Sequence, residues 1–144
     1  MDDKNMLSLI ENLTPQDLLW LLTVAADLSI TLLLYRLFGK MGLYTIVILN
    51  VMLSNFQGPK LTVIFGMETS LGVILYSGIY FATDLLSEKY GRKEAQRAVL
   101  LGFAASLILI LVIYISLLFE PSPLHPEFAQ NIHNAIATIF KFTP

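Results

Sequence analysis

The chain has 144 residues, of which 56% are apolar and 14% are charged, with a mean hydropathy of +0.69 and a formal net charge of −2. Soluble globular domains carry about 25% charged residues, so this composition excludes an ordinary soluble domain and predicts a membrane protein. The absence of cysteine excludes disulfides, thiolate catalysis and cysteine-ligated metal sites.

Residues 1–17 form a polar, acidic lead-in that carries four carboxylates and one lysine. Thr14 followed by Pro15 predicts the start of a helix, because threonine is favoured as an N-cap and proline at the first helical position. The acidic character and the lack of a small-residue cleavage site argue against a secretory signal peptide. We therefore expect an extracytoplasmic lead-in, followed by one transmembrane helical domain over residues 18–144.

Four apolar stretches follow, and each is expected to cross the membrane as a helix. A helix rises about 1.5 Å per residue, so about 20 residues cover a hydrocarbon core of about 30 Å. The second stretch is short enough that a re-entrant segment is an alternative. After a proline-rich break, residues 127–141 place apolar side chains on one face, which predicts an amphipathic helix or the start of a fifth span. The predicted fold class is an all-α polytopic membrane bundle with spans at about 18–38, 41–57, 61–86 and 98–119.

Basic residues predict the orientation, because cytoplasmic loops of membrane proteins are enriched in lysine and arginine. The segment Ser87–Arg97 carries four basic residues, and in a four-span arrangement Arg36 and Lys40 fall on the same side. We therefore expect a multi-pass protein of the cell membrane, surrounded by lipid, with its amino terminus outside and the loop 87–97 in the cytoplasm. The two glutamates within that loop argue against a nucleic-acid partner.

Ionisable residues inside the expected spans need a reason, because each costs about 2.5–3.5 kcal/mol on insertion scales. Asp27 and Asn50 lie in the middle of the first two spans, and Glu68 and Asp84 lie towards the two ends of the third. No group of side chains pairs a nucleophile with a base or gathers metal ligands. We therefore expect no catalytic residue, metal or cofactor, and we do not expect an enzyme.

A polar stripe is predicted along the third span, because four hydroxyl-bearing residues recur every seven positions. Such a stripe is what a hydrophilic solute pathway requires. The same hydroxyls, with the small-residue spacings Gly78–Ala82 and Gly102–Ser106, also fit plain helix–helix packing, so both interpretations stay open. The four residues are Thr62, Thr69, Tyr76 and Thr83.

Three motifs between residue 54 and the basic cluster are specific enough to suggest a family. Together they resemble the queuosine-precursor transporter family of vitamin-uptake integral membrane proteins, over about residue 41 to the carboxyl end. The resemblance implies import of a 7-deazaguanine such as preQ0, preQ1 or queuine. The motifs are Ser54-Asn55-Phe56-Gln57 ahead of Lys60, Ile64-Phe65-Gly66, and Thr83-Asp84-Leu85-Leu86-Ser87-Glu88 ahead of Tyr90-Gly91.

The resemblance also supplies candidate substrate-binding residues, namely those that match the polar motif of the family. Carboxylates and carboxamides can pair with the amide and amine edges of a purine-like ring. On that chemistry we expect Asp84 and Asn55 to recognise the substrate, Thr83 to position it, and Glu68 to form a wall or a proton-coupling group. The motif-matched residues are Asn55, Gln57, Thr83, Asp84 and Glu88.

Two departures from the family pattern bear on function. The family core usually has six spans and its first aligns with residues 41–57, so the span 18–38 is expected to be an extra leading helix. The chain also ends where the fourth core helix should begin, so it is expected to be truncated, a fragment, or half of a split protein that needs a missing half or a second copy. The alternative function is a small non-transporting membrane scaffold or subunit that binds partner helices.

Overall fold

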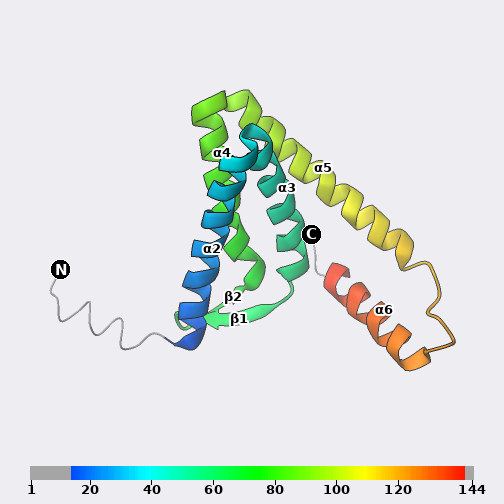
Figure 1. Ribbon diagram of the computed structural model, residues 1–144. Helices are drawn as coiled ribbons and strands as arrows, with labels where there is room; N and C mark the ends of the chain where they lie inside the picture. Colours follow the sequence, from blue (N-terminus) through cyan, green and yellow to red (C-terminus); the bar gives the residue numbers. More distant parts are fainter. Residues whose placement is uncertain (1–13, 142–144) are drawn as a thin grey trace.

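The computed structural model describes residues 14–141, so most of the predicted lead-in lies outside the described residues. Four long elements stand side by side, a β-hairpin closes one end, and a final helix lies to one side (Figure 1). We call the end with the hairpin the foot. The elements in order are α2 (Pro15–Phe38), α3 (Lys40–Gln57), β1 (Leu61–Ile64), β2 (Met67–Ser70), η1 (Leu71–Leu75), α4 (Tyr76–Tyr90), α5 (Arg92–Ser116) and α6 (Pro126–Lys141).

Helix α2 begins where the sequence predicts. The Thr14 hydroxyl accepts a hydrogen bond from the Asp17 amide at 3.3 Å, and the Asp17 carboxylate accepts one from the Thr14 amide at 2.9 Å. This reciprocal capping box satisfies two amides that a helix start leaves without intrahelical partners. With Pro15 at the first turn, the predicted N-terminus is confirmed.

Helix α3 occupies the centre of the bundle and packs against α2, α4 and α5. Its Leu43 and Val47 are fully buried and form the core together with Ala82 and Leu86 of α4. Small residues let the neighbouring helices approach closely. Gly78, Ala82, Gly102 and Ser106 are all buried, as the packing interpretation of their spacing requires.

The predicted continuous helix over 61–86 is wrong. Residues 61–70 form an antiparallel hairpin in which Thr62 pairs with Thr69, so these two threonines cannot share a helical stripe with Tyr76 and Thr83. The β-branched residues of β1 favour a strand, and the two-residue turn has positive φ at both Phe65 (51°) and Gly66 (75°), as a tight hairpin turn requires. An apolar run therefore looks like a helix by length alone, although its local chemistry encodes a hairpin.

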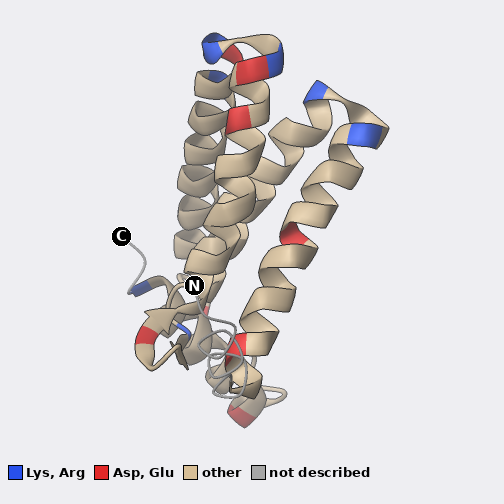
Figure 2. Ribbon diagram, turned by 90° about the vertical axis from the view of Figure 1, so that its left-hand side faces the viewer, with Lys and Arg blue, Asp and Glu red and all other residues tan. Residues whose placement is uncertain are grey.

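The predicted loop 87–97 is almost entirely helical. Helix α4 continues to Tyr90, the single residue Gly91 reverses the chain with a φ of 94°, and α5 starts at Arg92. Figure 2 shows that the lysines and arginines of this turn lie at the same end of the bundle as those of the α2–α3 turn. We call this the basic end. It lies opposite the foot.

The structure has the character of a membrane protein. Helices α2 and α5 are long and apolar enough to cross a bilayer. Many of their large apolar side chains are exposed, including Leu33, Leu37, Phe103 and Ile108. Amphipathic α6 forms over Pro126–Lys141 with no buried residue, and its Phe140 ring contacts Phe56 edge-on at 5.1 Å between centroids.

Candidate functional site

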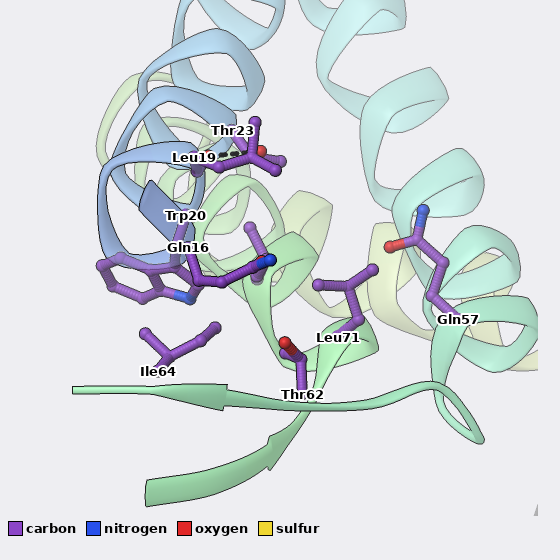
Figure 3. Close-up of a pocket in the computed structure, with 9 residues that line it drawn as sticks. Gln16, Leu19, Trp20, Thr23, Gln57, Thr62, Ile64 and Leu71 are labelled. Carbon is purple, nitrogen blue, oxygen red and sulfur yellow. Dashed lines mark hydrogen bonds between the residues drawn. The ribbon is translucent and has the colours of Figure 1, made fainter. Parts of the chain in front are cut away.

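A pocket lies at the foot between α2, the hairpin, η1 and the end of α3. Its volume is about 240 Å³, just below the range of drug-sized ligand sites, so it suits a small molecule. Figure 3 shows the side chains of Gln16 and Gln57 approaching from different helices, with the Trp20 indole and Ile64 at one end. Amide groups and an indole on an apolar wall can pair with and stack on a flat heteroaromatic ring. The lining residues are Gln16, Leu19, Trp20, Thr23, Gln57, Thr62, Ile64, Leu71 and Ile74.

The hairpin is held over this pocket by the first turn of α2. Besides capping the helix, the Asp17 carboxylate accepts a hydrogen bond from the Phe65 amide at 2.6 Å. The Trp20 ring meets the Phe65 ring edge-on, with centroids 5.7 Å apart. Phe65 has a positive φ, which is uncommon for a residue other than glycine. These two contacts offset the cost of that conformation and fix the position of the pocket wall.

A buried polar cluster lies midway along the bundle. Asp27 of α2 is only 6% exposed, and its carboxylate accepts hydrogen bonds from Asn50 Nδ2 at 2.8 Å and from the Gly78 amide at 2.9 Å. The Ser77 hydroxyl is 3.3 Å from the same carboxylate, and Asn50 also donates to the Leu75 carbonyl at 3.2 Å. One acidic side chain thus joins α2, α3 and the start of α4. From the sequence, Asp27 and Asn50 are polar residues in the middle of expected spans, with no predicted role.

Towards the basic end, α4 carries a polar line on its outer face. Tyr76, Tyr80, Asp84 and Glu88 are spaced four residues apart and are all exposed. Residues at this spacing lie on one face of a helix. Helix α4 therefore carries a polar line with a period of four, and Tyr76 is its one member from the predicted seven-residue stripe. Thr83 hydrogen-bonds to its own helix, through the carbonyls of Ile79 and Tyr80.

The six predicted site residues do not come together in one place. Gln57 lines the pocket, but the Asn55 amide donates to the Ser106 hydroxyl of α5 at 3.1 Å, and Glu68 is exposed on the hairpin. Thr83, Asp84 and Glu88 lie on α4 beyond the Asp27 cluster, on the side of the basic end. The structure thus separates the predicted set into a group near the foot and a group on upper α4.

The separation of the two groups follows from the buried cluster. Asn50 and Gly78 both hydrogen-bond to Asp27, so they lie at the same height along the bundle axis, on the antiparallel helices α3 and α4. Asn55 is five residues beyond Asn50 towards the foot, and Asp84 is six residues beyond Gly78 in the opposite direction. At 1.5 Å per residue these steps add to about 16 Å along the bundle. A single purine-sized molecule cannot contact both groups at once.

The basic end is closed by a charged clamp between α3 and α5. Glu94 accepts hydrogen bonds from the Tyr44 hydroxyl and from Lys40 Nζ, both at 2.9 Å, and pairs with Arg97 of its own helix. The hydrogen bond to Glu94 and the negative charge of that residue raise the pKa of the Lys40 ammonium above its usual value. Among residues 14–141 no three His, Asp or Glu side chains gather as metal ligands.

Comparison with known proteins supports the resemblance seen in the sequence. The family model described as "Putative vitamin uptake transporter" matches residues 70–144. A curated relative from Bacillus subtilis (strain 168), called "Probable queuosine precursor transporter", is 41% identical over 125 residues, or 87% of this chain and 52% of the relative. The chain belongs to the vitamin uptake transporter family. It spans about half the length of this curated relative, and the comparison with solved structures gave no significant match.

Membership of this family changes the view of helix α2. The match covers 125 of the 144 residues, so 19 are left over and the match starts no later than residue 20. Most of α2 is therefore shared with the relative, although it lies outside the residues that the family model matches. The point bears on the site, because α2 supplies Asp27 and three of the pocket residues that sequence analysis missed, namely Gln16, Trp20 and Thr23.

Proposed function

We propose that this vitamin uptake transporter family chain takes part in importing a queuosine precursor, a 7-deazaguanine of the preQ0, preQ1 or queuine type. The observation that carries the proposal is the 41% identity to a relative named as a queuosine precursor transporter. The pocket at the foot adds support, since its amide side chains and indole suit a small, flat, hydrogen-bonding ring. An enzyme is not the function, because the family is a family of transporters.

The proposed topology has four membrane crossings, with the foot outside and the basic end in the cytoplasm. The rises of α2, α3, η1 with α4, and α5 are about 36, 27, 32 and 37 Å at 1.5 Å per α-helical and 2.0 Å per 3₁₀ residue. Each of these lengths is close to or greater than the hydrocarbon thickness of about 30 Å. The gathering of basic residues at one end agrees with the positive-inside rule, and it puts the start of α2 on the outer side.

We propose that substrate enters at the foot pocket and leaves along α4. Gln57 pairs with the edge of the ring in the pocket, Asn55 supports that end of α3, and Glu68 forms part of the outer wall. Thr83, Asp84 and Glu88 then line the cytoplasmic half of the path. Exposed carboxylates are costly against lipid, so this face of α4 requires a covering of protein or water, supplied by a second half or a second copy.

Uptake of a radiolabelled deazaguanine tests the function. Cells without their own carrier should accumulate the label when they express the complete gene, and Gln57→Ala should reduce the initial rate several-fold. Gln130→Ala on α6 is the matched control, because it removes the same side chain far from the pocket. Uptake that does not depend on the gene would refute the proposed function. Normal uptake by Gln57→Ala would refute only the pocket assignment.

A membrane scaffold remains the alternative function. The exposed apolar faces of α2 and α5 would then contact partner helices instead of lipid. A protein that assembles stably with another helical membrane protein, and whose gene gives no uptake, would support this alternative.

A further inference from the structure

Asp27 is the one described carboxylate that is buried in the middle of a helix long and apolar enough to cross a membrane. It lies at the thirteenth of the 24 residues of α2. Every group that hydrogen-bonds to its side chain is a donor, from the Asn50 carboxamide, the Ser77 hydroxyl and the Gly78 amide. Such a set suits a carboxylate, which only accepts hydrogen bonds, and it satisfies both oxygens of the side chain.

No cation faces this carboxylate from any of the described elements that pack against α2. Along α2 the nearest charged residues are Asp17 and Arg36, about 13–15 Å away at 1.5 Å per residue. On α4 the nearest is Asp84, six residues beyond Gly78, and Tyr76 is 44% exposed beside Ser77. Elements η1 and β1 contain no titratable residue. The other titratable residues of α2, α3 and α4 hydrogen-bond to other groups or lie nearer the basic end. They are Tyr35, Lys40, Tyr44, Tyr80, Glu88, Lys89 and Tyr90.

The neighbours of Asp27 can also accommodate its neutral form. An asparagine carboxamide donates through nitrogen and accepts through oxygen, so turning the Asn50 side chain over would let its oxygen accept a hydrogen bond from a neutral Asp27. The turn would give up the 3.2 Å bond from Asn50 to the Leu75 carbonyl. That carbonyl is the last of η1, directly before α4 begins. The protonation state of Asp27 is thus linked to the break between η1 and α4.

The pocket at the foot reaches to within about one helical turn of Asp27. Thr23 lines that pocket and lies four residues before Asp27, on the same face of α2. Transporters commonly place coupling sites beside interrupted helices near the middle of the membrane. The Asp27 cluster has that position, between α2 and the η1–α4 break.

We infer that Asp27 is a proton-binding site that couples substrate import to proton entry; the inference rests on the proposed function. The carboxylate takes a proton from water in the foot pocket and becomes a neutral carboxyl group. The protonated oxygen donates to the turned Asn50 carboxamide, so the Leu75 carbonyl loses its donor, the start of α4 loosens and the path along α4 opens. The proton then leaves to the cytoplasm and the hydrogen bonds reform, so each cycle moves one proton with one substrate molecule.

Uptake into vesicles with imposed ion gradients tests this role. In wild-type protein an inward proton gradient should drive accumulation, and the initial rate should fall as the pH on the outer side is raised, because each substrate molecule enters with a proton. Asp27→Asn should lose accumulation but keep exchange of labelled for unlabelled substrate, since it cannot carry a proton. Glu127→Gln, the same change on exposed α6, should behave as wild type. A merely structural role would reduce accumulation and exchange together.

Three results would overturn the inference while leaving the proposed function intact. They are accumulation driven by a sodium gradient instead of a proton gradient, accumulation unaffected by pH, and full accumulation by Asp27→Asn. Wild-type vesicles without any uptake would instead refute the proposed function.

Infrared difference spectroscopy then tests the proton site without transport. A carboxyl band should appear on acidification of the purified wild-type protein. Should Asp27→Asn fail to fold, Asn50→Ala keeps the carboxyl group but removes a hydrogen-bond partner of Asp27, so the frequency of this band should change. An unchanged frequency would refute the site.

Discussion

Replacing Gly78 with alanine provides the sharpest test of the contact between α2 and α4. Gly78 is buried where α4 begins, and its amide donates to the Asp27 carboxylate. A methyl group built on Gly78 would lie 2.6 Å from Asn50 Nδ2 and inside the contact distance of Asp27 Oδ2. Both neighbours are already held by hydrogen bonds, so neither can move without losing one.

The magnitude follows from the shift that the methyl group requires. Ordinary contact begins at about 3.4 Å, so the Asn50 amide and α4 must separate by about 0.8 Å. An equal shift would lengthen the 2.9 Å bond from the Gly78 amide to about 3.7 Å, beyond hydrogen-bonding range. Overpacking costs about 1–3 kcal/mol, a lost interhelical bond about 0.6–2 kcal/mol, and the higher helix propensity of alanine returns about 1 kcal/mol. We expect a net loss of about 1–4 kcal/mol.

Thermal unfolding in detergent measures this loss. At about 2–4 °C per kcal/mol, Gly78→Ala should lower the apparent Tm by roughly 2–16 °C. Gly102→Ala is the matched control, because its methyl group would meet only the side chains of Val51, at 3.3 Å, and Val47, at 3.6 Å, and its Tm should stay near that of the wild type. If Gly78→Ala unfolds at the wild-type temperature, α4 does not approach Asp27 as closely as described.

Three further predictions concern the two ends of the bundle. Asp17→Ala removes the acceptor of the Phe65 amide, so the emission of Trp20, the single tryptophan, should shift to longer wavelength as the hairpin detaches; an unchanged spectrum would contradict the contact. Glu94→Gln should lower the Tm slightly at low salt and not at high salt, since partly exposed ion pairs are weak and screened; a large, salt-independent loss would show that the clamp matters more than its exposure suggests. A cysteine in place of Ser87 should react with an impermeant reagent from the cytoplasmic side, and reaction from outside would reverse the proposed topology.

The features that could be predicted from the sequence depend on local chemistry. Thr14 and Pro15 mark the start of α2 because a cap acts on residues of the same helical turn. The small-residue spacing at Gly78 and Gly102 indicated close packing, and the structure confirms it. The amphipathic pattern of 127–141 likewise appears as helix α6.

The features that the sequence did not reveal depend on distant contacts or on competing patterns. Residues 61–70 were apolar enough to resemble part of a span, although the Phe65-Gly66 pair was an available signal for a hairpin turn. The pairing of Asp27 with Asn50 joins residues that are 23 positions apart, and nothing in either helix alone specifies it. The foot pocket likewise depends on the hairpin folding back against α2. The prediction of one continuous helix over residues 61–86 left no room for that hairpin.

The cluster around Asp27 makes stability and transport compete in a way that can be measured. The hydrogen bonds from Gly78 and Asn50 hold α2, α3 and α4 together in the described state. The proposed protonation must break or turn the same bonds to open the path. Ser77→Ala removes only the longest of the donors, at 3.3 Å. It should therefore lower stability slightly and raise the initial rate of proton-driven uptake, because one of the contacts that hold α4 to α2 is lost while Ser77 keeps no other bond to α2. A variant that lost stability without this gain in rate would separate the packing role of the cluster from its proposed role in coupling.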